Sequence, residues 1–480
     1  MNNLKSESLK GFGWSFFERI VGYAIQFVFT ILLARMLTPE DFGLVGLLIV
    51  FTSISQVFIE SGFSQTLIRK RDTDNNIDYS AVFYFNLLTS IIIYFILFVL
   101  SKKIAAFYQE ERLVLICQIS FLSLIINSLT IVPNIILQKE MNFEVLSKRT
   151  LISNLIAGII SVGFAYAGFG VWSLVLQILI ANILKLVLIW YYIDWHPLRK
   201  IDLNPIKNLY KFSLNILFSS LLDTIVSNLH ILIIGKFYPK RDLGFYSQSY
   251  TLQSIPSNAL VSVIRSVTYP AMSKIQNDEI LLRNYFLKIQ SISFYIIFSL
   301  FVLLSIISNE IIRIVLGLQW IDSIYYFKML CFVGAFMPIY NLGMNVILVK
   351  GNGKKYLITS IYKRLITTSL VLMTISISIK FLIYGQILAV ILNSLVTILV
   401  SGNLLGISLK YQLSTLSKTI LIALSIYGLM IFGNDYLPQD NLYFSLLIKL
   451  TIFLSLFIAL SVALKVKEYY IIKDLLLRRN

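Results

Sequence analysis

Charged side chains inside long apolar runs are the residues of this sequence best suited to chemistry. An ionisable group in such a run costs about 3 kcal/mol or more unless it finds a partner or faces a water-filled cavity. Basic members could hold an anion through charge-assisted hydrogen bonds, whereas acidic members could carry a proton or a cation. The set consists of Glu18, Arg19, Glu60, Lys185, Asp223, His230, Arg265, Lys328 and Lys449.

The runs that surround these charges predict membrane-spanning helices. Of 480 residues, 57% are hydrophobic and only 14% are charged, too few to cover a soluble surface. Each run has about 20 residues and is continuous rather than alternating, which favours helices over strands. The sequence predicts an all-α polytopic membrane protein with about fourteen spans. Their limits are 14–36, 41–63, 79–101, 113–137, 150–168, 170–192, 210–235, 242–267, 285–308, 323–349, 356–379, 382–407, 416–433 and 442–464.

Lys and Arg residues between the runs predict the orientation of the spans. A cytoplasmic N-terminus places most of these residues inside and predicts a cytoplasmic C-terminus, in a bacterial inner membrane. The net charge of +17 then reflects topology and attraction to anionic lipids, and nucleic-acid binding is not expected. The predicted cytoplasmic connections include Arg69-Lys70-Arg71, Lys148-Arg149, Arg199-Lys200, Lys354-Lys355, Lys363-Arg364 and Arg478-Arg479.

Neither a cleaved leader nor a metal site is expected. The first residues, MNNLKSESLK, are polar, and no small-residue cleavage site follows the first apolar run, so we expect that run to stay as a span. Cys117 and Cys331 lie inside apolar runs without the spacing of metal ligands, and we expect them to be core residues.

One helix corner occurs twice, about 200 residues apart. The segments LARMLTPEDFGLVG (33–46) and IGKFYPKRDLGFYS (234–247) share a basic residue, five intervening positions and an acidic-apolar-Gly triplet. Proline and acidic residues suit a helix N-terminus, and each glycine allows close packing. Because six predicted spans separate the copies, both have the same orientation. The shared residues are Arg35, Asp41 and Gly43 in the first copy and Lys236, Asp242 and Gly244 in the second.

The repeat predicts two parallel six-helix lobes related by an axis along the membrane normal. An N-lobe would occupy 1–195 and a C-lobe 210–410, joined by a cytoplasmic connection at 196–209. The last part, 411–480, would add helices 13 and 14 and a basic tail. Two-lobed bundles of this kind are typical of alternating-access transporters.

Four further segments carry a family resemblance. They are ESGFSQTLIRKRD (60–72), LQKEMNFEVLSKRTLISN (137–154), AGFGVWSLVLQ (167–177) and LGFYSQSYTLQSIPSNALVSVIRSVTYPAMSKIQND (243–278). In this order the chain resembles polysaccharide exporters of the Wzx and teichuronic-acid type, within the multidrug/oligosaccharidyl-lipid/polysaccharide (MOP) exporter superfamily. The resemblance runs through roughly residues 10–410. It implies a flippase, without catalysis or an organic cofactor, that moves undecaprenyl-pyrophosphate-linked oligosaccharide outward for surface polysaccharide such as O-antigen of lipopolysaccharide. Implied partners are this lipid, anionic membrane lipids and polysaccharide assembly machinery.

The resemblance implies a cationic cavity, for which three basic residues are candidates. By the predicted topology Arg19, Lys185 and Arg265 lie at similar depth, one to two turns from the cytoplasmic surface, where they could take up a pyrophosphate. Snorkelling to the interface is the alternative and stays open for all three. Lys328 and Lys449 lie in the outer half, and for them we expect snorkelling. Asp223, Glu18 and Glu60 are possible ion-coupling or paired acids.

Two other functions compete with a flippase. A multidrug or cation antiporter of the same superfamily would need an acidic cavity, yet basic residues outnumber acids among the buried candidates. A polysaccharide polymerase or lipid-linked glycosyltransferase would need a large external loop, and every predicted connection is short. Both alternatives are therefore disfavoured.

Overall fold

The computed structural model describes residues 2–61, 63–64, 67, 76–199, 204–351, 353–433 and 441–477. Within these ranges the chain is helical and forms no strand. Several predicted basic residues lie outside them, namely Arg69, Lys70, Arg71, Lys200, Arg478 and Arg479.

Every predicted span coincides with a helix or a broken pair of helices in the described ranges. Twelve helical segments are long and apolar enough to cross a membrane, which makes this a multi-pass membrane protein. Helices α10 and α15 are long enough but more polar, so a count of fourteen spans is not confirmed. The helices at predicted spans are α1 (Asn2–Met36), α2 (Pro39–Glu60), α4 (Asn76–Tyr108), α5 (Leu113–Ser120), α6 (Leu122–Lys139), α7 (Phe143–Tyr166), α8 (Val171–Tyr192), α9 (Asn204–Phe237), α10 (Lys240–Lys274), α11 (Glu279–Ile306), α13 (Ser323–Ala335), α14 (Met337–Val349), α15 (Gly353–Thr374), α16 (Ile379–Leu405), α17 (Leu409–Phe432) and α18 (Leu442–Ala463).

Breaks and short helices are the features that the sequence pattern did not indicate. The fourth predicted span is interrupted at Phe121, between α5 and α6. The tenth is interrupted at Phe336, where Pro338 in the first turn of α14 lacks the N–H that a continuous helix would need. Among the described residues, three further elements are too short to span: α12 (Ser308–Val315), the 3-10 helix η1 (Leu318–Trp320) and α19 (Lys467–Leu477).

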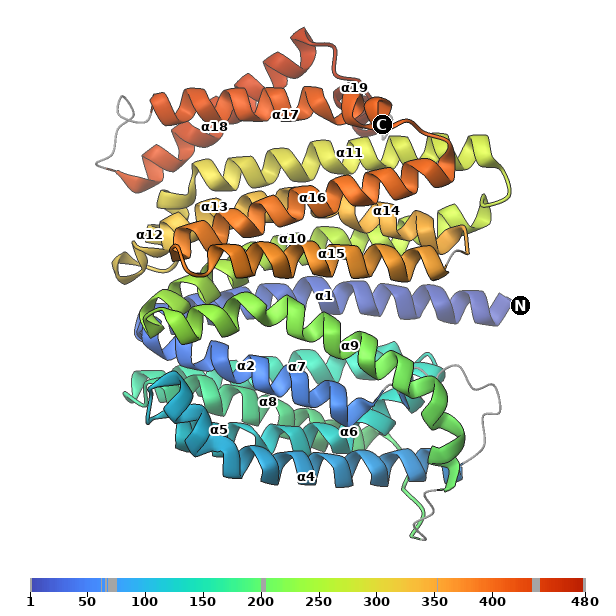
Figure 1. The fold of residues 1–480 in the computed structure, drawn as a ribbon, viewed down its shortest axis with the longest axis vertical. Coiled ribbons are helices and arrows are strands. Elements are labelled where there is room, and N and C mark those ends of the chain that lie inside the picture. Colours follow the sequence, from blue (N-terminus) through green and yellow to red (C-terminus); the bar gives the residue numbers. More distant parts are fainter. Residues whose placement is uncertain are drawn as a thin grey trace. The chain divides into compact units, whose positions relative to one another are not determined.

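The chain forms two compact units, Met1–Ser247 and Gln248–Asn480. In the first unit α7 packs between α1 and α8, while α2 packs on α9 and α4 on α6 (Figure 1). Helix α9, the first helix of the predicted C-lobe, thus belongs to the first unit by its contacts. The predicted lobe limits stay a prediction.

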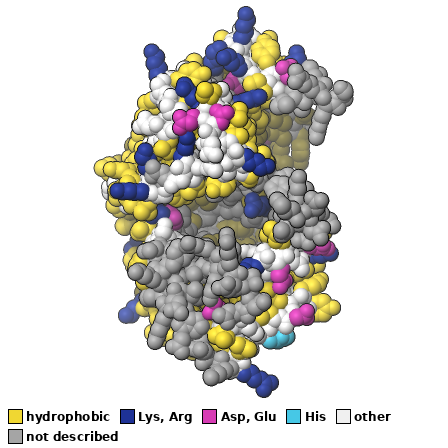
Figure 2. All heavy atoms as spheres, turned by 90° about the vertical axis from the view of Figure 1, so that its right-hand side faces the viewer, with side chains coloured by type: hydrophobic (Ala, Val, Ile, Leu, Met, Phe, Trp, Pro, Cys, Tyr) yellow, Lys and Arg dark blue, Asp and Glu magenta, His cyan; other side chains and the backbone are white. Residues whose placement is uncertain are grey.

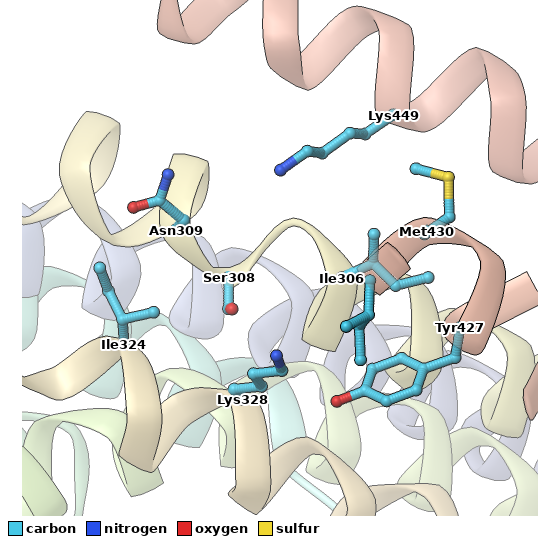
Figure 3. A pocket seen from close by; sticks show the side chains of 9 residues that line it. Ile306, Ser308, Asn309, Ile324, Lys328, Tyr427, Met430 and Lys449 are labelled. Carbon is cyan, nitrogen blue, oxygen red and sulfur yellow. The ribbon is translucent and has the colours of Figure 1, made fainter. Parts of the chain in front are cut away.

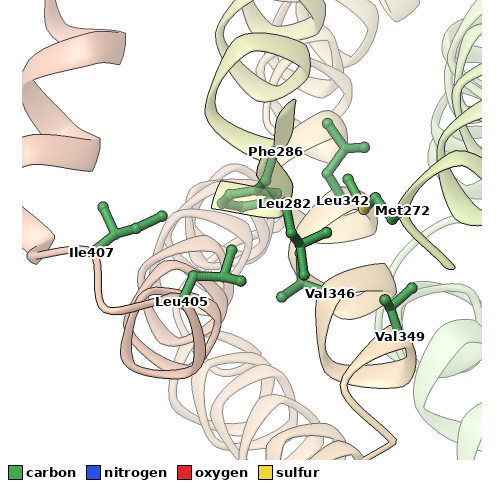
Figure 4. Close-up of a cluster of buried hydrophobic side chains, with 8 residues drawn as sticks. All are labelled: Met272, Leu282, Phe286, Leu342, Val346, Val349, Leu405 and Ile407. Atoms are coloured by element: carbon green, nitrogen blue, oxygen red, sulfur yellow. The ribbon is translucent and has the colours of Figure 1, made fainter. Parts of the chain in front are cut away.

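In the second unit α11 packs against α13 and α17, and α16 packs against α14 and α15. Apolar side chains join the ends of α10, α11, α14 and α16 in one cluster (Figure 4). Burying such side chains contributes about 1.5–3 kcal/mol each and fixes these helix ends to one another. The cluster consists of Met272, Leu282, Phe286, Leu342, Val346, Val349, Leu405 and Ile407.

The two copies of the repeated corner meet inside the first unit. Thr38 caps α2 in a reciprocal capping box with Asp41, and Pro39 follows at the first helical position. A Cβ placed on Gly43 would collide with the backbone carbonyl of Lys240, and one on Gly244 with that of Pro39. Both glycines are therefore needed for this close approach, as the sequence predicts.

Candidate functional site

A buried arginine in the first unit is the centre of the candidate site. Arg149 stands on the second turn of α7 and is only 8% exposed. Its Nη1 donates to the Oδ1 of Asn134 on α6 across 2.6 Å. Its Nε is buried and has no hydrogen-bond partner within the described part of the chain. Since an unpaired donor on a buried cation is costly, Arg149 is suited to receive an acceptor from a ligand.

Lys185 and Glu18 complete this group, which we term the Arg149 cluster (Glu18, Asn134, Arg149 and Lys185). The half-buried Lys185 of α8 interacts electrostatically with Arg149 and with Glu18 of α1. Glu18 also accepts from Ser147 Oγ, at 3.4 Å. Two cations therefore share a single carboxylate in the protein interior, and the cluster retains a positive charge.

Arg149, Lys185 and Asn134 lie at similar distances from the ends of the helices that carry them. Arg149 lies about 9 Å from the start of α7, and Lys185 lies about 10 Å from the end of α8. Asn134 lies about 8 Å from the end of α6, which is joined to the start of α7 by a short turn. Because these helices alternate in direction, all three residues lie one to two turns from the same side of the first unit.

Sequence reasoning missed Arg149 because it placed the start of this span at residue 150. In the structure Asn142 caps α7 by accepting from Val145 N, so the helix begins at Phe143. Consecutive helical residues point about 100° apart. Lys148 therefore faces outward to pair with Glu144 at i,i+4, while Arg149 faces inward. The Asn cap followed by the Glu144–Lys148 spacing is the signal that could have identified the helix start.

Arg19 and Arg265 are the other predicted cationic residues. Arg19 is exposed on α1 and, among the described side chains, forms no hydrogen bond or ion pair with Arg149 or Lys185. Arg265 lies on α10, but its side chain is outside the described residues. Lys185 is thus the predicted cation whose described side chain interacts with the buried arginine. Arg19 and Arg265 stay predictions.

The predicted acids lie in different environments. Glu18 is in the Arg149 cluster, as a paired acid. Glu60 is half-buried at the end of α2 and accepts from Gln56 Nε2 at 3.0 Å, which fits a structural role. Asp223 is exposed on α9. A role of Asp223 in ion coupling stays a prediction.

The second unit also buries a lysine within a helix. Lys363 on α15 is only 4% exposed, and its Nζ lies 3.4 Å from the centre of the Tyr340 ring on α14. Both Lys148-Arg149 and Lys363-Arg364 were expected in cytoplasmic connections. Each pair lies within a helix, and for Lys363-Arg364 this agrees with the predicted span 356–379. Each helix is the fifth of its predicted lobe, and each pair sends one cation into the interior of its own unit.

Snorkelling is wrong for Lys449. This residue is 5% exposed, and its Nζ donates to the Oε1 of Glu310 on α12 across 2.7 Å. Glu310 is 1% exposed and also accepts from Ser445 Oγ at 2.9 Å. Lys449 is buried because a carboxylate 139 positions away neutralises it, and no sequence spacing indicates that partner.

The geometry of the Arg149 cluster can bind an anion. A guanidinium with a vacant donor and a nearby ammonium match the oxygens of a phosphate or diphosphate. No cluster of His, Cys, Asp and Glu that could hold a metal ion occurs in the described ranges.

Comparisons with known proteins show what this chain is similar to. A family model described as polysaccharide biosynthesis protein matches residues 32–325. The teichuronic acid biosynthesis protein TuaB of Bacillus subtilis is 26% identical over 359 residues, covering 73% of each chain. The succinoglycan biosynthesis transport protein ExoT of Rhizobium meliloti is 24% identical over 266 residues, covering 55% of this chain and 54% of its own.

Solved structures show the fold. The lipid II flippase MurJ in an inward closed conformation superposes with a TM-score of 0.75 at 16% identity, covering 94% of this chain and 98% of that one. An inward-facing multidrug resistance MATE family transporter of the MOP superfamily gives 0.61 at 14% identity, covering 81% and 95%. The predicted MOP-type fold is confirmed, and the resemblance to MATE transporters is the weaker of the two.

Proposed function

Because the chain belongs to the polysaccharide biosynthesis protein family, we propose that it is a flippase for a lipid-linked oligosaccharide. It would carry undecaprenyl-pyrophosphate-linked repeat units across the bacterial inner membrane for surface polysaccharide assembly. This substrate class rests on the names of the relatives, which are proteins of teichuronic acid and succinoglycan biosynthesis. The protein would act as a transporter and not as an enzyme.

The Arg149 cluster is the observation that carries the proposal. A diphosphate bears several oxygens that accept hydrogen bonds, and Arg149 can meet two of them with its parallel N–H groups. Lys185 adds a second cation, and Glu18 limits the net charge so that the headgroup can leave again. Binding in this low-dielectric interior is stronger than at a water-exposed surface. The two predicted lobes would expose these cations alternately to either side of the membrane.

Charge distribution supports a cytoplasmic N-terminus in this proposal. Figure 2 looks onto the face at which the N-terminal end of α1 lies, and Lys and Arg side chains outnumber Asp and Glu on it. A basic excess on one side is typical of the cytoplasmic side of inner-membrane proteins. The Arg149 cluster stands one to two turns from that side, where a lipid-linked substrate would enter from the inner leaflet.

Reconstituted translocation tests the proposal. Purified protein is placed in liposomes that contain a fluorescent undecaprenyl-pyrophosphate oligosaccharide, and a membrane-impermeant enzyme reports how much reaches the accessible leaflet. We expect protein-dependent translocation that falls at least tenfold in Arg149→Gln and Lys185→Gln. Lys148→Gln is the matched control because it removes an equal charge from the adjacent, outward-facing position. Equal translocation rates in all three variants would show that Arg149 and Lys185 do not take part in transport.

A multidrug antiporter is the second candidate, favoured by the MATE-like fold. That function would need an acid accessible to a cationic substrate, and exposed Asp223 on α9 is the predicted residue for it. Efflux of a cationic dye under an ion gradient, lost in Asp223→Asn and unaffected in Arg149→Gln, would establish the antiporter instead of the flippase.

A further inference from the structure

A second cationic site lies in the second unit, well away in sequence from the Arg149 cluster. There the end of α11 and parts of α12, α13, α17 and α18 line a partly open cavity of about 210 Å³ (Figure 3). A water molecule occupies about 30 Å³ of liquid volume, so the cavity has room for a polyatomic group. It is lined by Ile306, Ser308, Asn309, Ile324, Lys328, Tyr427, Met430, Ile431 and Lys449.

Two lysines give the cavity its charge. Lys449 reaches in from α18 and Lys328 from α13, as Figure 3 shows. The Nζ of Lys449 donates to Glu310, but an ammonium carries two more donors. The Nζ of Lys328 lies 5.6 Å from the centre of the Tyr427 ring and has no hydrogen-bond partner in the described part of the unit. With a single carboxylate between them, the two lysines leave the site one positive charge.

The polar lining selects the class of ligand. Besides the ammonium groups, the side chains of Ser308 and Asn309 offer a hydroxyl and an amide donor. These donors come from several directions, which suits a group with three or four oxygens better than a carboxylate with two. A metal cation is excluded by the like charge of both lysines. Sugars alone would leave the positive charge unpaired.

We propose that this cavity binds a phosphate group, carried by an anionic phospholipid headgroup or by free phosphate. Lys449 lies about 10 Å from the start of α18, and Lys328 about 8 Å from the start of α13, so the site is near enough to the membrane surface for a headgroup to reach. Apolar Ile306, Met430 and Ile431 also line the cavity and could contact the upper part of an acyl chain. The site is independent of the proposed transport function.

Binding measurements on the full-length protein test both sources. In one arm, native mass spectrometry of protein taken from nanodiscs compares retained phosphatidylglycerol with phosphatidylcholine. In the other, calorimetry titrates inorganic phosphate. Lys328→Gln removes one cation without breaking the Lys449–Glu310 pair, Lys328→Arg keeps the charge, and Lys410→Gln removes an exposed lysine near the opposite end of α17.

We expect Lys328→Gln to weaken binding of at least one probe about tenfold, the loss of one charge-assisted contact. Lys328→Arg and Lys410→Gln should stay within about twofold of the wild-type chain. A loss in the phosphatidylglycerol arm identifies a lipid headgroup, and a loss in the phosphate arm identifies free phosphate. The proposal is overturned if the wild-type chain binds neither phosphatidylglycerol nor phosphate. It is also overturned if Lys328→Gln binds both probes as tightly as the wild-type chain does. Thermal unfolding of each variant verifies that it is folded.

Discussion

Gly43 and Gly244 each face a backbone carbonyl of the other's helix corner, Gly43 that of Lys240 and Gly244 that of Pro39. The spacing from Gly43 to Gly244 equals that from Pro39 to Lys240, so the contact is reciprocal. Reciprocity of this kind is what a twofold relation between two copies of one motif produces. The two copies of the repeated corner therefore pack directly against each other in the first unit, in addition to closing two helical hairpins. We refer to this contact as the joint.

Adding a methyl group at this joint should destabilise the protein. In Gly244→Ala and Gly43→Ala the new Cβ meets a backbone carbonyl, which cannot move aside as a flexible side chain could. Such overpacking costs about 1–3 kcal/mol. Thermal unfolding of the purified protein measures the loss as a lower Tm. Gly163→Ala is the matched control, because this helical glycine has open space around it and alanine favours the helix. A wild-type Tm in both corner variants would show that the helices can separate without loss.

Arginine at position 149 should not be replaceable by lysine. An ammonium can match the charge but not the parallel N–H groups that bind a diphosphate or the hydrogen bond to Asn134. We expect Arg149→Lys to lower the translocation rate about tenfold, whereas Lys185→Arg keeps most of it. The rates come from the liposome assay at equal protein content. If Arg149→Lys translocates at the wild-type rate, charge alone accounts for the role of this residue.

An ion pair in the connection between α4 and α5 should make the stability of the fold depend on pH. Arg112 donates to both carboxylate oxygens of Glu110, at 2.7 and 3.1 Å. These hydrogen bonds hold the pKa of Glu110 below its ordinary value. The pair therefore stabilises the fold above the ordinary carboxyl pKa of 4.5, and that contribution is lost as the pH falls through the lowered pKa.

The variant Arg112→Gln isolates this contribution. Because Arg112 is half-exposed, solvent screens the pair and its loss costs about 0.2–1 kcal/mol at pH 7. The Tm difference from the wild-type chain should shrink toward zero as the pH falls below the lowered pKa of Glu110, because Glu110 is then protonated in both proteins. Glu111→Gln, one position further along, removes an acid outside the pair. A Tm difference that does not change with pH would contradict an ionised Glu110 as the origin.

The helices could be predicted closely because about 20 consecutive apolar residues leave few alternatives in a membrane. The polar ends of the helices could not be predicted in this way. Helix α1 begins at Asn2 rather than at residue 14, and α10 continues to Lys274 rather than ending at residue 267. This error hid the main site residue, since Arg149 falls inside a helix only when α7 begins at Phe143. Lys185 was predicted because it stands alone in an apolar run. The partner of Lys449 was unpredictable, since tertiary packing brings Glu310 to it.

Removing one partner of the buried Lys449–Glu310 pair should lower the stability of the protein more than removing both. Breaking such a pair from one side leaves an uncompensated charge in the interior and costs about 3–5 kcal/mol. Lys449→Met should therefore lower the Tm strongly, because Glu310 is 1% exposed and loses its cation. The double variant Glu310→Gln with Lys449→Met removes both charges and should recover much of the loss. Lys410→Met, on the exposed part of α17, should leave the Tm nearly unchanged. Additive losses in the double variant would mean that the two residues stabilise the second unit independently, in contradiction to the 2.7 Å contact.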